Sequence, residues 1–172
     1  NIDGIINVNE TNFKNRINKF FGESLFFFNS KELKKIASEF NFIKEIKIKK
    51  IYPDTLNIIL QENEPIAILI ENNKKILLLE MGNTVSNYHV DIINSLPTVS
   101  GMNAKKNFYN FYKTLKKVNF DTELIEEIKY FGIDRWDIIL KSGKIIKLPT
   151  ERFESSIEKF ISIYDKDNFT NF

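Results

Sequence analysis

The sequence predicts an α+β protein in two parts, an amino-terminal β-α-α-β-β unit and a mainly β region with flanking helices. Apolar residues recur at helical spacing in two early segments, and from Glu45 the period changes to two. Pro65 then interrupts an apolar run. Because proline is disfavoured inside a central strand, we expect a domain boundary beside it, with domains at residues 1–66 and 67–172.

The first part is predicted to begin with a short strand over residues 2–8. A helix follows, capped by Thr11 or Asn12, with four apolar residues on one face: Phe13, Ile17, Phe20 and Phe21. Ser30 is the expected N-cap of a second helix, and the apolar linker 25–28 is expected to enter the same core. A strand from Glu45, a turn over 52–55 and a return strand over 56–60 complete the unit.

The second part reads mostly as strands separated by turns. The predicted elements are a hairpin of 66–70 and 75–79 around Asn72-Asn73, a turn at 81–83, an irregular crossing at 96–101, a helix over 104–118, strands over 125–133, 136–140 and 144–148, and a final helix containing Phe153 to Tyr164.

Composition excludes several classes of function. The 172 residues carry a net charge of only +2, which is too small to favour nucleic acid as a partner. Without cysteine there is no thiolate zinc site, iron–sulfur cluster or catalytic thiol. Six scattered glycines form no phosphate-binding loop. We therefore expect no cofactor and no metal.

Candidate catalytic residues are few. His89 is the only imidazole, lacks a ligand pattern, and is expected to be a surface residue. Glu62 and Glu64 could share a strand face as a carboxylate pair, but a solvated strand end is the favoured interpretation. No residue combination points to an enzyme, so a binding module is the better hypothesis.

Two further patterns could bind anions or bases. The lysine-rich stretch 44–50 could contact phosphates, although the solvated face of an amphipathic strand is favoured. The phenylalanine clusters at 20–21 and 26–28 could stack on bases, but their spacing fits core packing better. Strands with exposed edges can instead bind a partner by strand addition.

Five motifs in register resemble the FtsQ/DivIB family of bacterial cell-division proteins. The first two are the turn motif Tyr52, Pro53, Thr55 and Leu56, and the run from Glu62 through Pro65 to Ala67. The others are LLLEMGNTV at 77–85, LPTVSG at 96–101, and Arg135-Trp136-Asp137 with Leu140, Gly143 and Leu148-Pro149. The last run has a form associated with alphaproteobacterial members.

The resemblance implies a POTRA domain over residues 1–66 and the family's β domain over 67–172. It implies a non-catalytic scaffold of the division machinery that binds FtsB and FtsL, with an FtsK-type protein as a recruiter. It also implies a single-pass inner-membrane protein acting at the division septum. This chain would be its periplasmic part, without the anchoring helix.

Partner binding in the family is implied to occur by strand addition at the end of the β domain. Family members continue past the final helix into further strands, so we expect the main binding edge to lie beyond Phe172. Within the chain, Arg135, Trp136 and Tyr164 are the partner-side candidates, although Trp136 is favoured as a core residue. Asp134 stands where members often carry a basic residue, which weakens the expectation of an ion pair there.

Two other hypotheses stay open at this point. A POTRA-containing outer-membrane assembly or secretion component would show further POTRA repeats or a barrel. A catalytic or nucleic-acid-binding domain would need a convergent polar pocket or a continuous basic surface.

Overall fold

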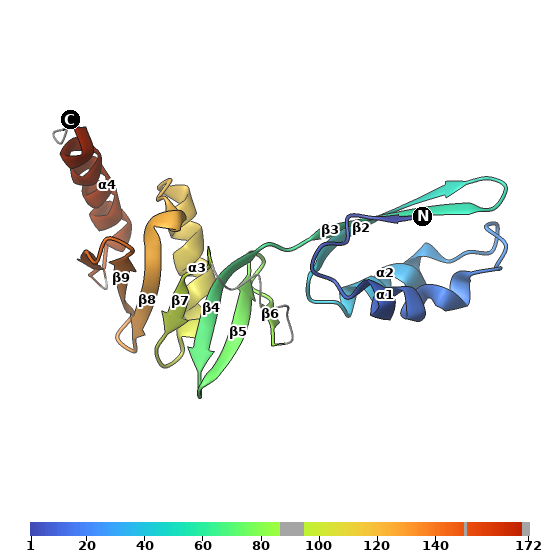
Figure 1. The fold of residues 1–172 in the computed structure, drawn as a ribbon, viewed down its shortest axis with the longest axis horizontal. Coiled ribbons are helices and arrows are strands. Elements are labelled where there is room, and N and C mark those ends of the chain that lie inside the picture. Colours follow the sequence, from blue (N-terminus) through green and yellow to red (C-terminus); the bar gives the residue numbers. More distant parts are fainter. Residues whose placement is uncertain (87–94, 150, 170–172) are drawn as a thin grey trace. The chain divides into compact units, whose positions relative to one another are not determined.

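The computed structural model of the chain describes residues 1–86, 95–149 and 151–169, which form two compact units (Figure 1). The first unit consists of residues 1–65 and 79–86, and the second of residues 66–78 and the described residues from 95 onward. The elements are β1 (Ile2–Asp3), α1 (Glu10–Ile17), η1 (Asn18–Phe20), α2 (Ser30–Ser38), β2 (Ile43–Ile51), β3 (Thr55–Glu62), β4 (Pro65–Glu71), β5 (Lys74–Leu79), β6 (Thr84–Val85), β7 (Thr98–Ser100), α3 (Ala104–Lys117), η3 (Thr122–Leu124), β8 (Ile125–Phe131), β9 (Arg135–Leu140), β10 (Ile145–Lys147) and α4 (Phe153–Phe169).

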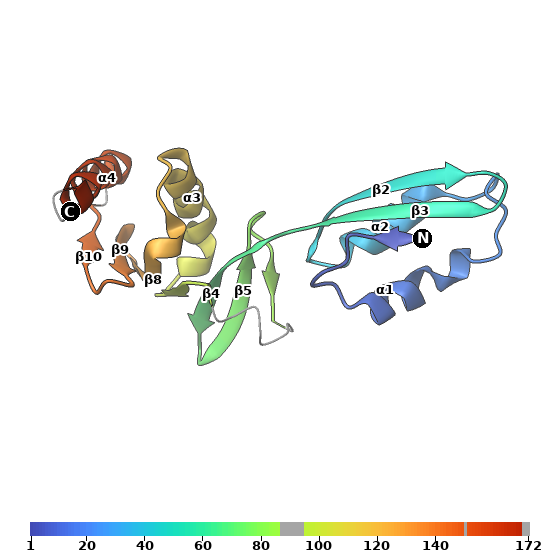
Figure 2. The ribbon, with the colours of Figure 1, turned by 45° about the horizontal axis from the view of Figure 1, so that its top comes forward.

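The first unit has the predicted β-α-α-β-β order. Its three-stranded sheet runs β1-β3-β2 (Figure 2). β1 is parallel to β3, with Ile2 opposite Ile58, and β2 is antiparallel to β3. β1 is shorter than predicted, since the chain leaves the sheet after Asp3.

The N-caps of both helices in this unit lie one or more residues before the predicted ones. Asn9 caps α1 by accepting the Asn12 N–H at 2.8 Å, and Asn29 caps α2 by accepting the Lys31 N–H at 3.0 Å. The predicted caps Thr11, Asn12 and Ser30 were therefore wrong. Asparagine is as good an N-cap as serine, so residue type alone did not decide which of two neighbouring positions caps each helix.

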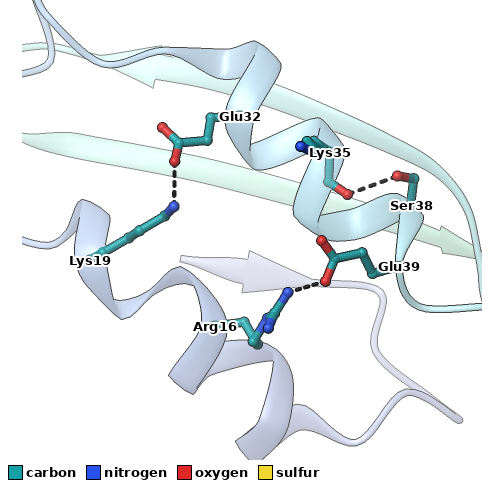
Figure 3. Close-up of polar contacts among 6 residues, drawn as sticks. All are labelled: Arg16, Lys19, Glu32, Lys35, Ser38 and Glu39. Atoms are coloured by element: carbon teal, nitrogen blue, oxygen red, sulfur yellow. Dashed lines mark hydrogen bonds and ion pairs between the residues drawn. The ribbon is translucent and has the colours of Figure 1, made fainter.

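The two helices pack through a buried apolar interface and carry ion pairs at its rim. Phe13 and Leu33 are fully buried, and the Phe13 ring meets Phe40 edge-on at 5.3 Å between ring centres. Arg16 and Lys19 pair with Glu39 and Glu32 across the helices (Figure 3). Because all four charged side chains are about half exposed, burial of the aromatic and leucine side chains contributes more stability than these pairs do.

The linker between the helices departs from the prediction that it enters the core. Leu25 and Phe28 are buried, but Phe26 and Phe27 are 78% and 89% exposed. The N–H groups of Phe27 and Phe28 both donate to the Ser24 carbonyl, at 3.0 and 3.1 Å, which closes a single helical turn. Residues three apart share a side of such a turn, so positions 25 and 28 point inward and the intervening rings point outward.

The larger sheet has the strand order β10-β9-β8-β7-β4-β5-β6 and, apart from its β6 end, lies in the second unit. The hairpin around Asn72 and Asn73 is confirmed, and both residues have positive φ as a two-residue hairpin loop requires. The irregular crossing expected at 96–101 is instead strand β7, which pairs in parallel with β4 and β8. Its central residue, Val99, is fully buried.

Helices α3 and α4 pack against one face of this sheet. The predicted apolar face of α3 is confirmed, since Phe108, Phe111, Tyr112 and Leu115 are buried in the core that it shares with the sheet. Ile157 anchors α4 in the same core. Among the described residues, no helix has the length and apolarity needed to cross a bilayer.

Candidate interaction surfaces

Strand β9 divides the partner-side candidates between the two faces of the sheet. Side chains alternate along a strand, so Trp136, Ile138 and Leu140 enter the core beneath the helices, and Arg135 and Asp137 lie on the opposite face. We call the part of that opposite face on β8, β9 and β10 the open face, because the core formed by α3 and α4 lies on the other side.

Trp136 is a packed core residue, as the sequence favoured. Its side chain is 4% exposed and stacks on Phe111, with ring centres 4.4 Å apart and an angle of 15° between the planes. Tyr130 lies against it at 4.5 Å. In this conformation Trp136 holds α3 on the sheet and offers little surface to a partner.

A hydrogen-bonded chain fixes the turn before β9. The Tyr130 hydroxyl donates to the Asp134 carboxylate at 2.5 Å and lies 2.8 Å from the Asn107 side-chain amide, which donates to it. The bond to Asp134, together with burial of the phenol, raises the pKa of Tyr130 above its ordinary value. Asp134 is therefore engaged inside the unit, at the position where family members often carry a basic residue.

Arg135 lies on the open face between an aromatic ring and a carboxylate. Its guanidinium carbon is 4.1 Å from the centre of the Phe131 ring, and its Nε is 3.3 Å from Asp137 Oδ1. Asp137 is only 7% exposed, with Lys129 and Lys147 opposite it on the neighbouring strands. This row of mixed charges was not predicted from the sequence, although the period-two pattern of β8 and β9 places these residues on one face.

Tyr164 lies on α4, away from the open face. It stacks on Phe160 at 5.3 Å between ring centres, and the Lys144 amine lies 5.4 Å above its ring. Since α4 packs on the face that buries Trp136, the structure does not bring Arg135, Trp136 and Tyr164 into one surface.

Strand β10 forms one edge of the sheet in the described chain. The Leu140 N–H donates to Lys144 O, and the Leu148 N–H donates to Trp136 O, each at 2.9 Å. Bonded pairs alternate in an antiparallel ladder, so the N–H groups of Ile145 and Lys147 point away from β9. This edge presents backbone donors and acceptors to which a further strand can pair.

The residues of the turn motif lie at one end of the first unit. Tyr52 is 57% exposed and the Tyr52–Pro53 peptide is cis. Thr55 donates from its hydroxyl to Asp54 at 2.9 Å, and Leu56 is partly buried in β3. A cavity of about 280 Å³ lies beside this turn, lined by residues of β3, η1 and the helix linker together with Asn1.

Glu62 is not part of a solvated strand end, so that interpretation was wrong for this residue. Its carboxylate accepts three backbone N–H groups, from Ile6 at 2.8 Å, Asn7 at 2.7 Å and Val8 at 3.0 Å. These three donors lie 54 to 56 residues before Glu62, so no local sequence pattern could reveal the bonds. Glu64 is exposed, so the two carboxylates do not form a pair. Pro65 opens β4 at its first residue, where a strand tolerates proline.

The lysine-rich strand β2 is largely the solvated face that the sequence favoured. Lys44, Lys47 and Lys49 are exposed. Lys50 is the exception, since its amine donates to the carbonyls of Leu25 at 2.6 Å and Phe28 at 3.3 Å and so ties the helix linker to β2. His89 lies outside the described residues.

Comparison with known proteins gives the same assignment for both units. Residues 1–63 match the FtsQ-type POTRA domain, and residues 67–170 match the carboxy-terminal domain of the cell division protein FtsQ/DivIB. The chain is 32% identical over 167 residues to the cell division protein FtsQ of Rickettsia bellii and 31% identical over 169 residues to that of Rickettsia typhi. Each alignment covers 97% of this chain and 62% of the relative, so the chain spans under two thirds of the length of these relatives.

Among solved structures, the extracytoplasmic domain of the division protein DivIB from Geobacillus stearothermophilus is similar at 17% identity and a TM-score of 0.46. The similarity covers 60% of this chain and 92% of that one. The POTRA assignment and the two-part α+β fold predicted from the sequence are confirmed by the family matches. The chain belongs to the FtsQ/DivIB family of bacterial cell division proteins.

Proposed function

We propose that this chain is the periplasmic part of a non-catalytic scaffold of the division machinery. It binds FtsB- and FtsL-type proteins through its second unit, helps to control septal peptidoglycan synthesis, and is held at the inner membrane by one helix outside this chain. The POTRA domain, residues 1–66, contributes to recruitment to the septum, with an FtsK-type protein as its partner.

The edge of the sheet at β10 is the observation that carries this proposal. Ile145 and Lys147 direct their N–H groups away from the sheet, and Ile145 is 58% exposed. A partner strand that pairs with the β10 edge gains backbone hydrogen bonds, and this mode of binding requires no catalytic group. Arg135 on the adjacent open face supplies a partly exposed charge that would orient it.

The test is calorimetric titration of the periplasmic FtsB–FtsL segment into residues 1–172 and into the whole periplasmic part of the same protein. Residues 1–172 contain the β10 edge and should bind, and tighter binding by the longer version would show that further residues add to the interface. Lys147→Pro removes an outward N–H from β10 without breaking its ladder to β9, and should weaken binding at least tenfold in whichever version binds. Lys147→Ala removes the same charge but keeps the N–H, so it should bind as the parent does.

Absence of binding in both folded versions would refute the assignment of these partners. Equal effects of Lys147→Pro and Lys147→Ala would refute strand pairing on this side of the sheet. The match of residues 67–170 to the cell-division family argues against the alternative of an outer-membrane assembly or secretion component.

A further inference from the structure

The first unit exposes a concentration of large apolar side chains at one end. Phe21, Phe26, Phe27, Ile51 and Tyr52 are between 44% and 89% exposed, and we call them the aromatic tip. They come from the α1–α2 linker and from the end of β2 with its turn to β3, two segments that lie side by side in both ribbon views (Figures 1 and 2). The rings of Phe26 and Tyr52 are 5.3 Å apart. Large apolar side chains that are exposed together are a feature of interaction sites.

We propose that the aromatic tip inserts into the interfacial layer of a lipid bilayer. The rings are exposed on two loops, and a bilayer can take up such side chains without a complementary pocket. Tyr52 adds a polar hydroxyl to an apolar ring, the combination that favours the level of the lipid headgroups. The inference goes beyond the proposed scaffold role, because it assigns a membrane contact to the folded unit itself.

The loops are held in place, so insertion requires little ordering. Lys50 ties the linker to β2 through the Leu25 and Phe28 carbonyls, and the buried side chains of Leu25 and Phe28 anchor the exposed pair between them. A preorganised tip loses less conformational entropy when it binds than a disordered loop would.

Charge around the tip is mixed. Lys49 is exposed next to it, and the carboxylates Glu23 and Asp54 lie in the same two loops. We therefore expect insertion of the rings, rather than attraction to anionic headgroups, to supply most of the affinity, and the dependence on salt to be weak.

The beginning of the chain lies at the same end of the unit. The Asn1 amine donates to the Leu56 carbonyl at 2.9 Å, two residues into β3 from the turn. An anchoring helix before Asn1, as proposed above, would leave this end facing the bilayer. Only this step rests on the proposed anchor, because residues 1–172 alone should bind vesicles if the tip inserts.

The experiment is co-sedimentation of residues 1–172 with vesicles of phosphatidylethanolamine and phosphatidylglycerol, repeated with phosphatidylcholine. The parent chain should bind both. Phe26→Ser and Phe27→Ser should each lower the partition coefficient roughly tenfold, because each withdraws one ring from the bilayer. Both side chains are largely exposed, so the variants should fold, and Trp136 fluorescence and circular dichroism check this.

Ile6→Ser is the matched control. Ile6 is 82% exposed in the same unit, but its N–H bonds to Glu62, at the opposite end of β3 and roughly 23 Å along the strand from the turn. Its replacement should leave vesicle binding unchanged. Phe27→Trp provides a second readout, since brominated lipid should quench the introduced indole and should not quench that of Ile6→Trp.

No vesicle binding by the folded parent chain would overturn the proposal. So would equal losses in Phe27→Ser and Ile6→Ser. Concentration-dependent self-association that Phe26→Ser abolishes, in the absence of vesicle binding, would assign the tip to a second copy of the chain instead. The proposed anchoring helix is tested separately: release of the full-length protein from washed membranes would refute the anchor without bearing on vesicle binding by residues 1–172.

Discussion

Replacing Glu62 should destabilise the first unit more than replacing the neighbouring carboxylate Glu64 does. Its three backbone N–H partners belong to residues 6–8, which form the path from β1 to α1. Hydrogen bonds to a charged acceptor contribute about 1.5–3 kcal/mol each to stability. Because Glu62 is partly exposed, each of its three bonds should contribute at most about 1.5 kcal/mol. Glu62→Ala should therefore lower the free energy of unfolding by about 3 kcal/mol.

Glu62→Gln should cost less, about 1–2 kcal/mol. The amide keeps one acceptor oxygen for the Ile6 and Val8 N–H groups, which share Oε1, but it turns an NH₂ group toward Asn7. Glu64→Ala is the matched control, because Glu64 is an exposed carboxylate two residues away and its loss should stay within about 0.5 kcal/mol.

The assay is urea unfolding followed by far-ultraviolet circular dichroism, with hydrogen exchange of the amides of residues 6–8 as the local readout. The single tryptophan lies in the second unit, so its fluorescence reports that unit separately. If Glu62→Ala and Glu64→Ala unfold alike and the amides of residues 6–8 stay protected, the three bonds do not hold the first unit together.

Two predictions concern the second unit. Gly101→Ala should destabilise it by at least ~2 kcal/mol, because Gly101 has a φ of 120° and a Cβ there would stand 2.1 Å from the Tyr130 carbonyl oxygen. Gly132→Ala is the control, because a Cβ there would meet nothing within 4 Å. Both variants are measured by the urea unfolding transition of Trp136 fluorescence. Equal losses of stability would contradict the close approach of Gly101 to the Tyr130 carbonyl. The raised pKa of Tyr130 predicts that stability falls as the pH rises above about 10, since the unfolded chain then loses its phenolic proton before the folded one does. Tyr130→Phe should lose this alkaline decline, and a decline as steep as in the parent would show that another group causes it.

Much of the fold follows from local signals in the sequence. The apolar face of α3 and the Asn72-Asn73 hairpin are strong patterns, and both are confirmed. The order of elements in the first unit is confirmed as well. Strand β7 was missed because only three residues lie between Pro97 and Gly101, too few for a visible period, and its pairing partners β4 and β8 lie far away in the chain.

The surfaces were harder to predict than the core. Burial of Trp136 follows from the period of β9, whereas the outward direction of Phe26 and Phe27 depends on a single turn closed on Ser24. Hydrophobicity alone assigned these rings to the core. The three bonds of Glu62 depend on long-range geometry that no spacing in the sequence encodes.

The position of β4 in its sheet bears on how the chain folds during synthesis. β4 pairs in parallel with β7, and β7 pairs in parallel with β8, which is reached only after helix α3. β4 can pair with β5 as soon as the hairpin is made, but its other edge stays unpaired until β7 follows, and β7 in turn lacks its second neighbour until β8 is made. Such non-local parallel pairing is intrinsically slow. Translation of the second unit would leave an aggregation-prone strand exposed. A chaperone that shields apolar segments should raise the yield of the whole chain more than the yield of residues 1–65 alone.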